Sequence, residues 1–467
     1  MTRANKKTDH INIKAIYKKN KTTTILFLFS TIYLLLGHYI HVNWDFAAYV
    51  LNAKYWFSDG VYFELIRPPL TQFIIGIFGA IINLKPAEYL YILLVSLLHL
   101  FASRKFCKSY KIDHIKYYAF TITPYFLFYG TSEGTELLSL SLLELFLAYI
   151  AKTKGGIFLS LACLTRYNNF SYILLLLYNK KVKKIIKPLA IFILTFSPWL
   201  IYNQIKYKNP LTSIANNYAQ NILLSNYLNT SINPIHFAII IGTLAPLFIL
   251  GLAKCNWKNR KNILILSFLL LTMHFYIFST SKIIRFLYHT ILPISYFSTT
   301  GLESINKHNA KKIFNTIITL NILISIYSIQ IIESEDINYP DITKQLDSSC
   351  IHMSNDWVKL NYYGLPTEPS PHKGTVKHHL DNGHRIILFK HLKEPAYTAD
   401  REFLKTLPVI TDNEEYILLG YSTKCQKNNN TDQTYLENLN ETIYIQHNYS
   451  INIDPYFILN PFTKKEY

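Results

Sequence analysis

Acidic and basic side chains stand out in a chain that is otherwise poor in charge. Of its 467 residues, 50% are hydrophobic and only 16% are charged, so an isolated charge far from a polar segment is a candidate for chemistry. Carboxylates act as general acids and bases, and guanidinium groups bind phosphate oxygens in a two-pronged geometry. The candidates of both kinds are Asp45, Glu133, Glu136, Arg67, Arg166, Lys282 and Arg285.

The elements that must position these residues are apolar helices. Runs close to membrane-spanning length recur between residues 22 and 330, which indicates a multi-span membrane protein rather than a soluble core. The runs at 24–40, 188–202, 236–252, 263–278 and 313–332 are examples. The formal net charge of +18 does not indicate nucleic-acid binding, because the basic residues sit in short clusters between the apolar runs.

The basic clusters predict the orientation in the membrane. Six clusters hold 26 Lys and Arg residues, and the segments between them hold eight. The positive-inside rule places the clusters in the cytoplasm and the candidate residues on the outer face. This pattern predicts about eleven spans in the plasma membrane, with a cytoplasmic N-terminus and an extracytoplasmic C-terminus. Segment 71–84 is short and is interpreted as interfacial or re-entrant, and 155–178 must hold two short crossings around Arg166.

The chain divides into a basic cytoplasmic N-terminus (1–21), a multi-span domain (22–333) and a small extracytoplasmic α/β domain (334–467). In the last part, apolar runs shorten to strand length, as in "RIILF" (385–389) and "EYILLGY" (415–421). The segment 347–364 is typical of a strand, a turn and a short helix. The five cysteines lack zinc-site spacing, and Cys350 and Cys425 are either paired or free thiols.

Each candidate also has an ordinary structural interpretation. Asp45 suits a helix end, and Glu133 and Glu136 suit a solvated loop. Lys282 and Arg285 are placed where headgroup anchors occur. The remaining alternatives are that Arg67 pairs with Glu64 and that Tyr49 belongs to an interfacial aromatic belt.

The order of the motifs favours a functional interpretation. The series "DFAAY" (45–49), "RPPL" (67–70), "TSEGTE" (131–136), "LTRYNNF" (164–170) and "KIIRFLYHTILP" (282–293) resembles the membrane-embedded GT-C glycosyltransferases. The resemblance covers about residues 20–310 and is greatest to the branch with the protein O-mannosyltransferases and the aminoarabinose transferases. The chain departs from many relatives in having Phe46 where they have a second acid.

This resemblance implies a function and a set of roles. The donor would be a polyprenyl-phosphate sugar and the acceptor a hydroxyl of a glycan, lipid or protein on the outer face. Asp45 would be the general base, and Glu133 and Glu136 would be further catalytic residues, either of which could orient the acceptor. The reaction would invert the configuration at the anomeric carbon. The implied donor phosphate ligands are Arg67, Arg166, Lys282 and Arg285, and the implied substrate contacts are Tyr49 and Tyr288.

No cofactor and no obligatory metal are expected, since no cluster of metal ligands is visible in the sequence. The main alternative is a multi-span transporter or lipid flippase, which would also hold converging charges. Internal repeats are expected of such a protein, and none is seen in the sequence.

Overall fold

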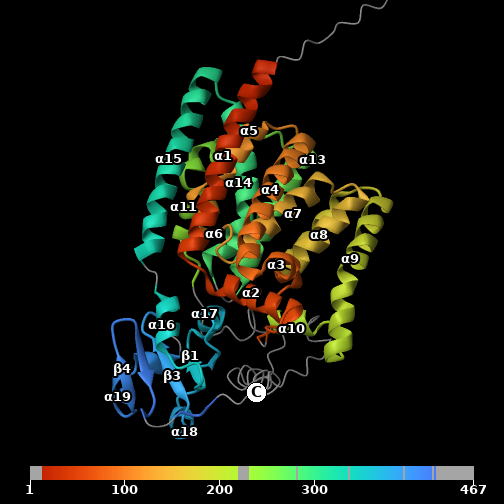
Figure 1. The fold of residues 1–467 in the computed structure, drawn as a ribbon. Helices are drawn as coiled ribbons and strands as arrows, with labels where there is room; N and C mark the ends of the chain where they lie inside the picture. Colours follow the sequence, from red (N-terminus) through yellow and green to blue (C-terminus); the bar gives the residue numbers. More distant parts are fainter. Residues whose placement is uncertain are drawn as a thin grey trace, which may run out of the picture.

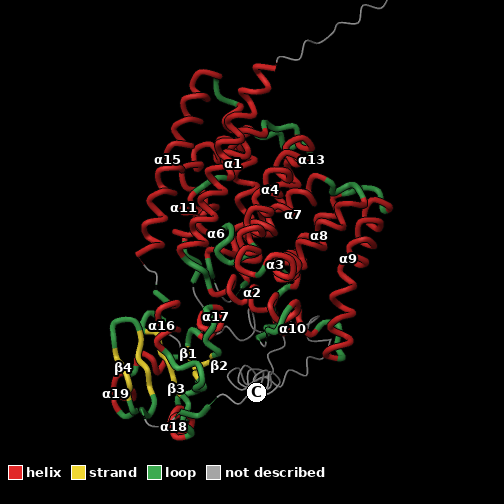
Figure 2. The backbone as a smooth tube through the Cα atoms, in the orientation of Figure 1, coloured by secondary structure: helices red, strands yellow, loops and turns green. Residues whose placement is uncertain are grey.

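The structure, a computed structural model, describes residues 13–60, 62–218, 231–279, 282–334, 337–392, 395–422 and 425–427. Helices dominate the described chain, and its strands gather in one region at one end of the helical bundle (Figure 2). Residues up to 334 form this bundle, here called the helical domain. Residues from 337 onward form a smaller unit, here called the sheet domain. The last helix of the bundle ends at Ser334, beside the boundary expected between 333 and 334.

The helical domain contains α-helices and three 3₁₀ segments, labelled as in Figure 1. They are α1 (Ile13–Ile40), α2 (Trp44–Phe57), α3 (Pro69–Ile82), α4 (Leu84–Tyr110), α5 (His114–Thr121), α6 (Pro124–Tyr129), α7 (Glu136–Ala148), α8 (Thr153–Thr165), η1 (Tyr167–Tyr178), α9 (Lys183–Tyr207), α10 (Thr212–Tyr218), α11 (Pro234–Ile241), η4 (Gly242–Leu244), α12 (Ala245–Lys254), α13 (Arg260–Phe278), η5 (Ile284–Thr290), α14 (Ile291–Glu303) and α15 (Lys307–Ser334).

Six helical stretches of the described chain are long and apolar enough to cross a membrane. They are Lys21–Ile40, Leu84–Tyr110, Lys183–Tyr207, Pro234–Lys254, Arg260–Phe278 and Lys307–Gln330. The expected total of about eleven is therefore not confirmed. Helices α7 and α14 are apolar but have only 13 residues each and are buried along nearly their whole length. Their neighbours shield them, so their length says little about the thickness of a bilayer.

Two local predictions concern short elements near the candidate residues. Most of segment 71–84 lies in the 14-residue helix α3 (Pro69–Ile82). This helix ends where Asn83 adopts a left-handed φ of 72°, and α4 begins with Leu84. Helix α8 ends at Thr165, Arg166 is extended, and η1 continues from Tyr167. The chain therefore breaks at the basic residue around which two short crossings were expected.

The sheet domain contains short helices packed on a five-stranded sheet. The elements are α16 (Tyr339–Gln345), β1 (His352–Ser354), α17 (Trp357–Tyr362), β2 (Thr367–Pro369), α18 (Val376–Asp381), β3 (Arg385–Phe389), η6 (Ala396–Ala399), α19 (Arg401–Lys405), β4 (Val409–Asp412) and β5 (Tyr416–Leu419). The strand order is β2-β1-β3-β5-β4, with β1 parallel to β2 and β3, and β5 antiparallel to β3 and β4. Cys350 and Cys425, left open by the sequence, form a disulfide across 75 residues.

The sheet domain covers one end of the bundle, and the start of α1 lies at the opposite end (Figure 1). Helix α17 lies against α2, which crosses the covered end of the bundle. The two domains otherwise have separate apolar cores. The elements that carry the candidate charges therefore lie close to the contact between the domains.

Candidate active site

Asp45 lies in the first turn of α2, directly after a loop of three residues that follows α1. Asn43 caps this helix, because its side chain accepts a hydrogen bond from the Asp45 amide at 3.3 Å. Residues 46–53 are all buried, and because they span about two turns, this part of α2 is enclosed on every side. The Asp45 side chain keeps 23% of its surface exposed, which leaves its carboxylate accessible from outside the bundle.

Arg67 is brought to Asp45 by the segment between α2 and α3. Its Nη1 atom lies 2.8 Å from Oδ1 of Asp45, and its Nε atom pairs with Glu64. Asn52 fixes this segment by accepting from the Glu64 amide at 2.8 Å and donating to the Glu64 carbonyl at 3.0 Å. Pro69 then starts α3, because a proline is well suited to the first turn of a helix. The motif "RPPL" thus ends the segment with its guanidinium aimed at the acid.

Arg285 approaches Asp45 from a distant part of the chain. This residue belongs to η5, and its Nη1 atom pairs with both Asp45 and Glu133. Glu133 lies in the turn between α6 and α7, where Gly134 adopts a φ of +83° that only glycine accepts readily. The Gly134 carbonyl accepts a hydrogen bond from the hydroxyl of Tyr91. Asp45 is therefore held between two guanidinium groups, and it shares Arg67 with Glu64 and Arg285 with Glu133.

A second pair lies beside this cluster. Glu136 opens α7 with its carboxylate buried, and Arg166, at the break between α8 and η1, donates to it. The Arg166 Nη1 atom also lies 3.3 Å from the hydroxyl of Thr135. The charge of Arg166 acts on Glu133, so the pair belongs to the same electrostatic environment.

Asp45 and Glu133 have different pKa values because their environments differ. Burial alone would raise the pKa of Asp45, but Arg285 and Arg67 outweigh it and hold that pKa well below its usual range. Burial raises the pKa of Glu133 to about 8; Arg285 opposes the rise and the negative charge of Asp45 adds to it. At neutral pH Asp45 is thus an anion while Glu133 is mostly a neutral acid. Two carboxyl groups with separated pKa values are the arrangement that divides base and acid roles.

Solved structures of known proteins share this architecture. The chain is similar to ArnT from Cupriavidus metallidurans bound to undecaprenyl phosphate, with a TM-score of 0.60, 11% sequence identity, and coverage of 85% of this chain and 97% of that one. The apo state of the same protein gives a TM-score of 0.61 at 11% identity, with coverage of 85% and 98%. The chain therefore shares the fold of these ArnT structures. No protein-family model matches it, and no curated protein sequence does.

The likeness confirms the resemblance drawn from the ordered motifs, at the level of the fold. It extends beyond the 20–310 region, because the coverage is too large to leave out the sheet domain. The apolar helices and this fold support a membrane protein.

The other candidates lie at varying distances from the cluster. Tyr49 is close, since the guanidinium carbon of Arg67 is 5.2 Å from the centre of its ring. Lys282 precedes η5, and its ammonium donates to the Ser279 carbonyl. Tyr288 is 1% exposed and its hydroxyl donates to the Phe126 carbonyl at 3.1 Å. Its observed contacts are thus those of a core residue.

Glu64 is the residue of the cluster that sequence reasoning did not include among the site residues. It appeared there only as an alternative partner of Arg67. The structure shows that Arg67 holds Glu64 and Asp45 together, so the two interpretations were not exclusive. The hydroxyl of Tyr62 also donates to Glu64. The sequence feature that could have indicated Glu64 is its position three residues before Arg67, a spacing at which the two side chains can pair.

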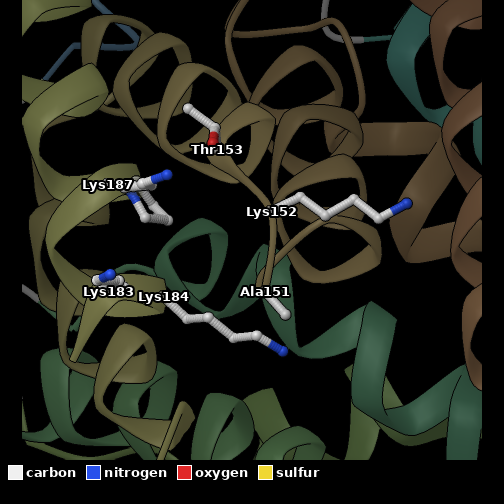
Figure 3. A pocket seen from close by; sticks show the side chains of 7 residues that line it. Ala151, Lys152, Thr153, Lys183, Lys184 and Lys187 are labelled. Atoms are coloured by element: carbon white, nitrogen blue, oxygen red, sulfur yellow. The ribbon is translucent and has the colours of Figure 1, made fainter. Parts of the chain in front are cut away.

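Two other features of the described chain lie apart from this cluster. A cavity of about 340 Å³ lies at the starts of α8 and α9, whereas Arg166 follows the other end of α8. It is lined by Ala151, Lys152, Thr153, Lys183, Lys184, Lys187 and Pro188 (Figure 3). In the described residues, three potential metal ligands gather at Asp347, Cys350 and Cys425. The two cysteines there are joined in the disulfide, so their sulfur atoms are not thiolate ligands.

Proposed function

We propose that the chain is an integral membrane glycosyltransferase that transfers a sugar from a polyprenyl-phosphate donor to a hydroxyl acceptor by a single inverting displacement. The observation that carries the proposal is the placement of Asp45 between Arg67 and Arg285. A base next to converging guanidinium groups suits an attack by a hydroxyl with a phosphate as leaving group. The GT-C fold and a solved ArnT bound to undecaprenyl phosphate support the same chemistry.

The donor would enter with its phosphate at the guanidinium groups and its polyprenyl tail in the bilayer. Arg67, Arg285 and Arg166 would bind the phosphate oxygens, with Lys282 as a further cation near η5. The leaving phosphate gains negative charge as the bond to the anomeric carbon breaks. Fixed cations stabilise this growing charge without reorganisation, which lowers the barrier.

Asp45 would take the proton of the acceptor hydroxyl as its oxygen attacks the anomeric carbon. The bond to the phosphate oxygen breaks in the same step, so the configuration at that carbon inverts. Glu133, mostly neutral at pH 7, would donate a hydrogen bond that orients the acceptor. Glu136 would hold Arg166 in place. Tyr49 would contact the substrate, and for Tyr288 the core position favours a supporting role.

No obligatory metal is proposed for this reaction. The carboxylates of the cluster are already satisfied by guanidinium groups: Asp45 by Arg67 and Arg285, and Glu136 by Arg166. The cations that a phosphate leaving group needs are thus supplied by side chains.

The proposed orientation has the start of α1 in the cytoplasm and the sheet domain outside the plasma membrane. Its support is that the two lie at opposite ends of the bundle (Figure 1). The lysine-lined cavity at the starts of α8 and α9 belongs to basic clusters that the positive-inside rule assigns to the cytoplasm. A disulfide in the sheet domain agrees with an oxidising compartment.

The test is sugar transfer by membranes that contain wild type, Asp45→Asn or Asp59→Asn, offered a panel of polyprenyl-phosphate sugars with lipid, glycan and protein acceptors. Asp59 is an exposed acid of the same outer segment, so its variant controls for the chemical change. Transfer by wild type and Asp59→Asn that is lost in an equally abundant Asp45→Asn is expected. Equal transfer by all three proteins would remove Asp45 from the mechanism. Movement of a lipid or solute without transfer would favour the transporter or flippase instead.

A further inference from the structure

Helix α17 belongs to the sheet domain in the chain but packs into the helical domain. Val358 is fully buried in the main apolar core of the bundle, and Trp357 and Tyr362 pack against that same core. Leu360, on the same helix, is buried instead in a core of the sheet domain. This short helix therefore joins the two domains, and Figure 1 shows it between α2 and the strands.

Trp357 contacts both segments that carry the charges around Asp45. Its ring centroid lies 5.8 Å from that of Trp44, edge to face, and 5.1 Å from that of Tyr62. Trp44 is the residue immediately before Asp45. Tyr62 donates to Glu64, which in turn binds Arg67. The Trp357 indole thus contacts Trp44, which precedes Asp45, and Tyr62, which supports Arg67 through Glu64.

The far end of α17 is fixed to α4, and through Glu88 of α4 it is linked to α1. The Tyr362 hydroxyl donates to the buried carboxylate of Glu88 on α4 at 2.5 Å, and Lys85 donates to the same hydroxyl at 2.5 Å. Glu88 also lies 2.8 Å from Nε2 of His38 near the end of α1. Since α17 is anchored at both ends, the position of the Trp357 ring is set by the bundle and not by the sheet domain alone.

We infer that Trp357 is a positioning residue for the reaction proposed above, holding the start of α2 and the 62–67 segment so that Asp45 and Arg67 stay aligned. The inference rests on the proposed function for its kinetic part. These two segments are separated by the whole length of α2, and Asp45 and Arg67 meet across that gap at 2.8 Å. An aromatic ring packed against both Trp44 and Tyr62 restrains their spacing, because such pairs have a preferred geometry. Misplacement of a reacting group by about 1 Å costs about 100-fold in rate.

The experiment compares full-length wild type with Trp357→Ala, Trp357→Phe and Trp257→Ala. Trp257 precedes α13 and packs on Phe297, so its loss controls for the removal of a tryptophan from another part of the bundle. We expect kcat per folded protein to fall about 10- to 100-fold in Trp357→Ala, to fall less than about threefold in Trp357→Phe, and to stay unchanged in Trp257→Ala.

The pH profile separates positioning from a general loss of structure. Asp45 must be ionised to act as a base, so activity falls as the pH drops through its pKa. When Arg67 is no longer held, its effect on Asp45 weakens and the acid limb of kcat moves to higher pH. An unchanged limb in Trp357→Ala, or activity that falls only in proportion to folded protein, would overturn the inference.

A binding measurement distinguishes failure of the inference from failure of the proposed function. The probe is undecaprenyl phosphate, titrated into each detergent-solubilised full-length protein. We expect Trp357→Ala to bind about tenfold more weakly than wild type and Trp257→Ala to bind equally. If no protein transfers sugar, the proposed function fails, and weakened binding in Trp357→Ala alone still supports the positioning of Arg67. Equal binding by all the variants would refute it.

Discussion

Replacement of Glu133 by glutamine tests the acidity that the cluster imposes on this side chain. Burial raises the pKa of Glu133 to about 8, with Asp45 adding to the rise against the effect of Arg285. At pH 7 about nine in ten molecules then carry the neutral acid, and at pH 9 about one in ten does. Glutamine is uncharged and of similar shape, so it imitates the neutral form at every pH.

The variant should resemble wild type at pH 7 and exceed it above pH 8. At pH 7, Glu133→Gln should keep transfer within about threefold of wild type, because the charge at this position hardly changes. Above pH 8 the wild type should lose activity about tenfold per pH unit as Glu133 ionises beside Asp45. The variant should lack this loss and stay level to pH 9.

The assay is the initial rate of sugar transfer from pH 6 to pH 9.5 with saturating donor, for wild type, Glu133→Gln and the control Asp59→Asn. An infrared titration provides a readout that does not depend on activity. A band of a protonated carboxylic acid should disappear in wild type near pH 8 and be missing in Glu133→Gln at pH 7. A fall of two orders of magnitude in the variant at pH 7 would show that the ionised carboxylate is needed, and would refute the reasoning.

Further predictions concern the ion pairs, the disulfide and metal ions. Arg285→Lys should lower kcat/KM about 10- to 100-fold, because an ammonium lacks the planar, five-donor geometry with which a guanidinium binds carboxylates and phosphate together. Rates at saturating and at limiting donor measure this loss. Arg166→Gln should destabilise the protein by about 3–5 kcal/mol by leaving the buried Glu136 unpaired, and Glu136→Gln in the same chain should restore much of the loss in thermal unfolding. Cys350→Ser should lower the stability of the sheet domain by about 2–5 kcal/mol, measured as faster proteolysis beyond residue 337. Transfer should persist in EDTA, and its abolition with recovery on adding a divalent cation would contradict the proposed absence of an obligatory metal.

The sequence predicted the sheet domain closely at three places. "RIILF" is β3 (Arg385–Phe389), and "EYILLGY" contains β5 (Tyr416–Leu419). The segment 347–364 forms a strand, a turn and α17, as expected. These segments combine short apolar runs with turn residues, so local sequence carries the structural information.

Hydropathy alone does not determine the number of spans. Helices such as α7 and α14 are buried along nearly their whole length, so neither their length nor their periodicity marks a boundary with lipid.

The role of Tyr288 was also not determined by its place in the sequence. A tyrosine three residues after Arg285 is compatible with a binding site, but it is equally compatible with the core when its hydroxyl donates to a backbone carbonyl.

The convergence of the charges was predictable, but their pairing was not. The membrane orientation predicted from the basic clusters placed Asp45, Arg67 and Arg285 on one face. In the structure, both guanidinium groups contact Asp45. That Asp45 is shared by both guanidinium groups depends on the positions of η5 and of the segment before α3. These positions are set by tertiary packing, which the order of motifs does not contain.

The pairing also bears on how charge is balanced during the proposed reaction. Asp45, Glu64 and Glu136 face Arg67, Arg166 and Arg285, so three carboxylates oppose three guanidinium groups before the donor binds. A donor phosphodiester adds one negative charge, and its phosphate gains another as the sugar leaves. Asp45 loses its charge in the same step by accepting the acceptor proton. The net charge of the site therefore stays constant through the transfer, while Arg67 and Arg285 are released from Asp45 to bind the phosphate. On this argument the ion pairs seen without substrate are the resting form of the groups that stabilise the transition state.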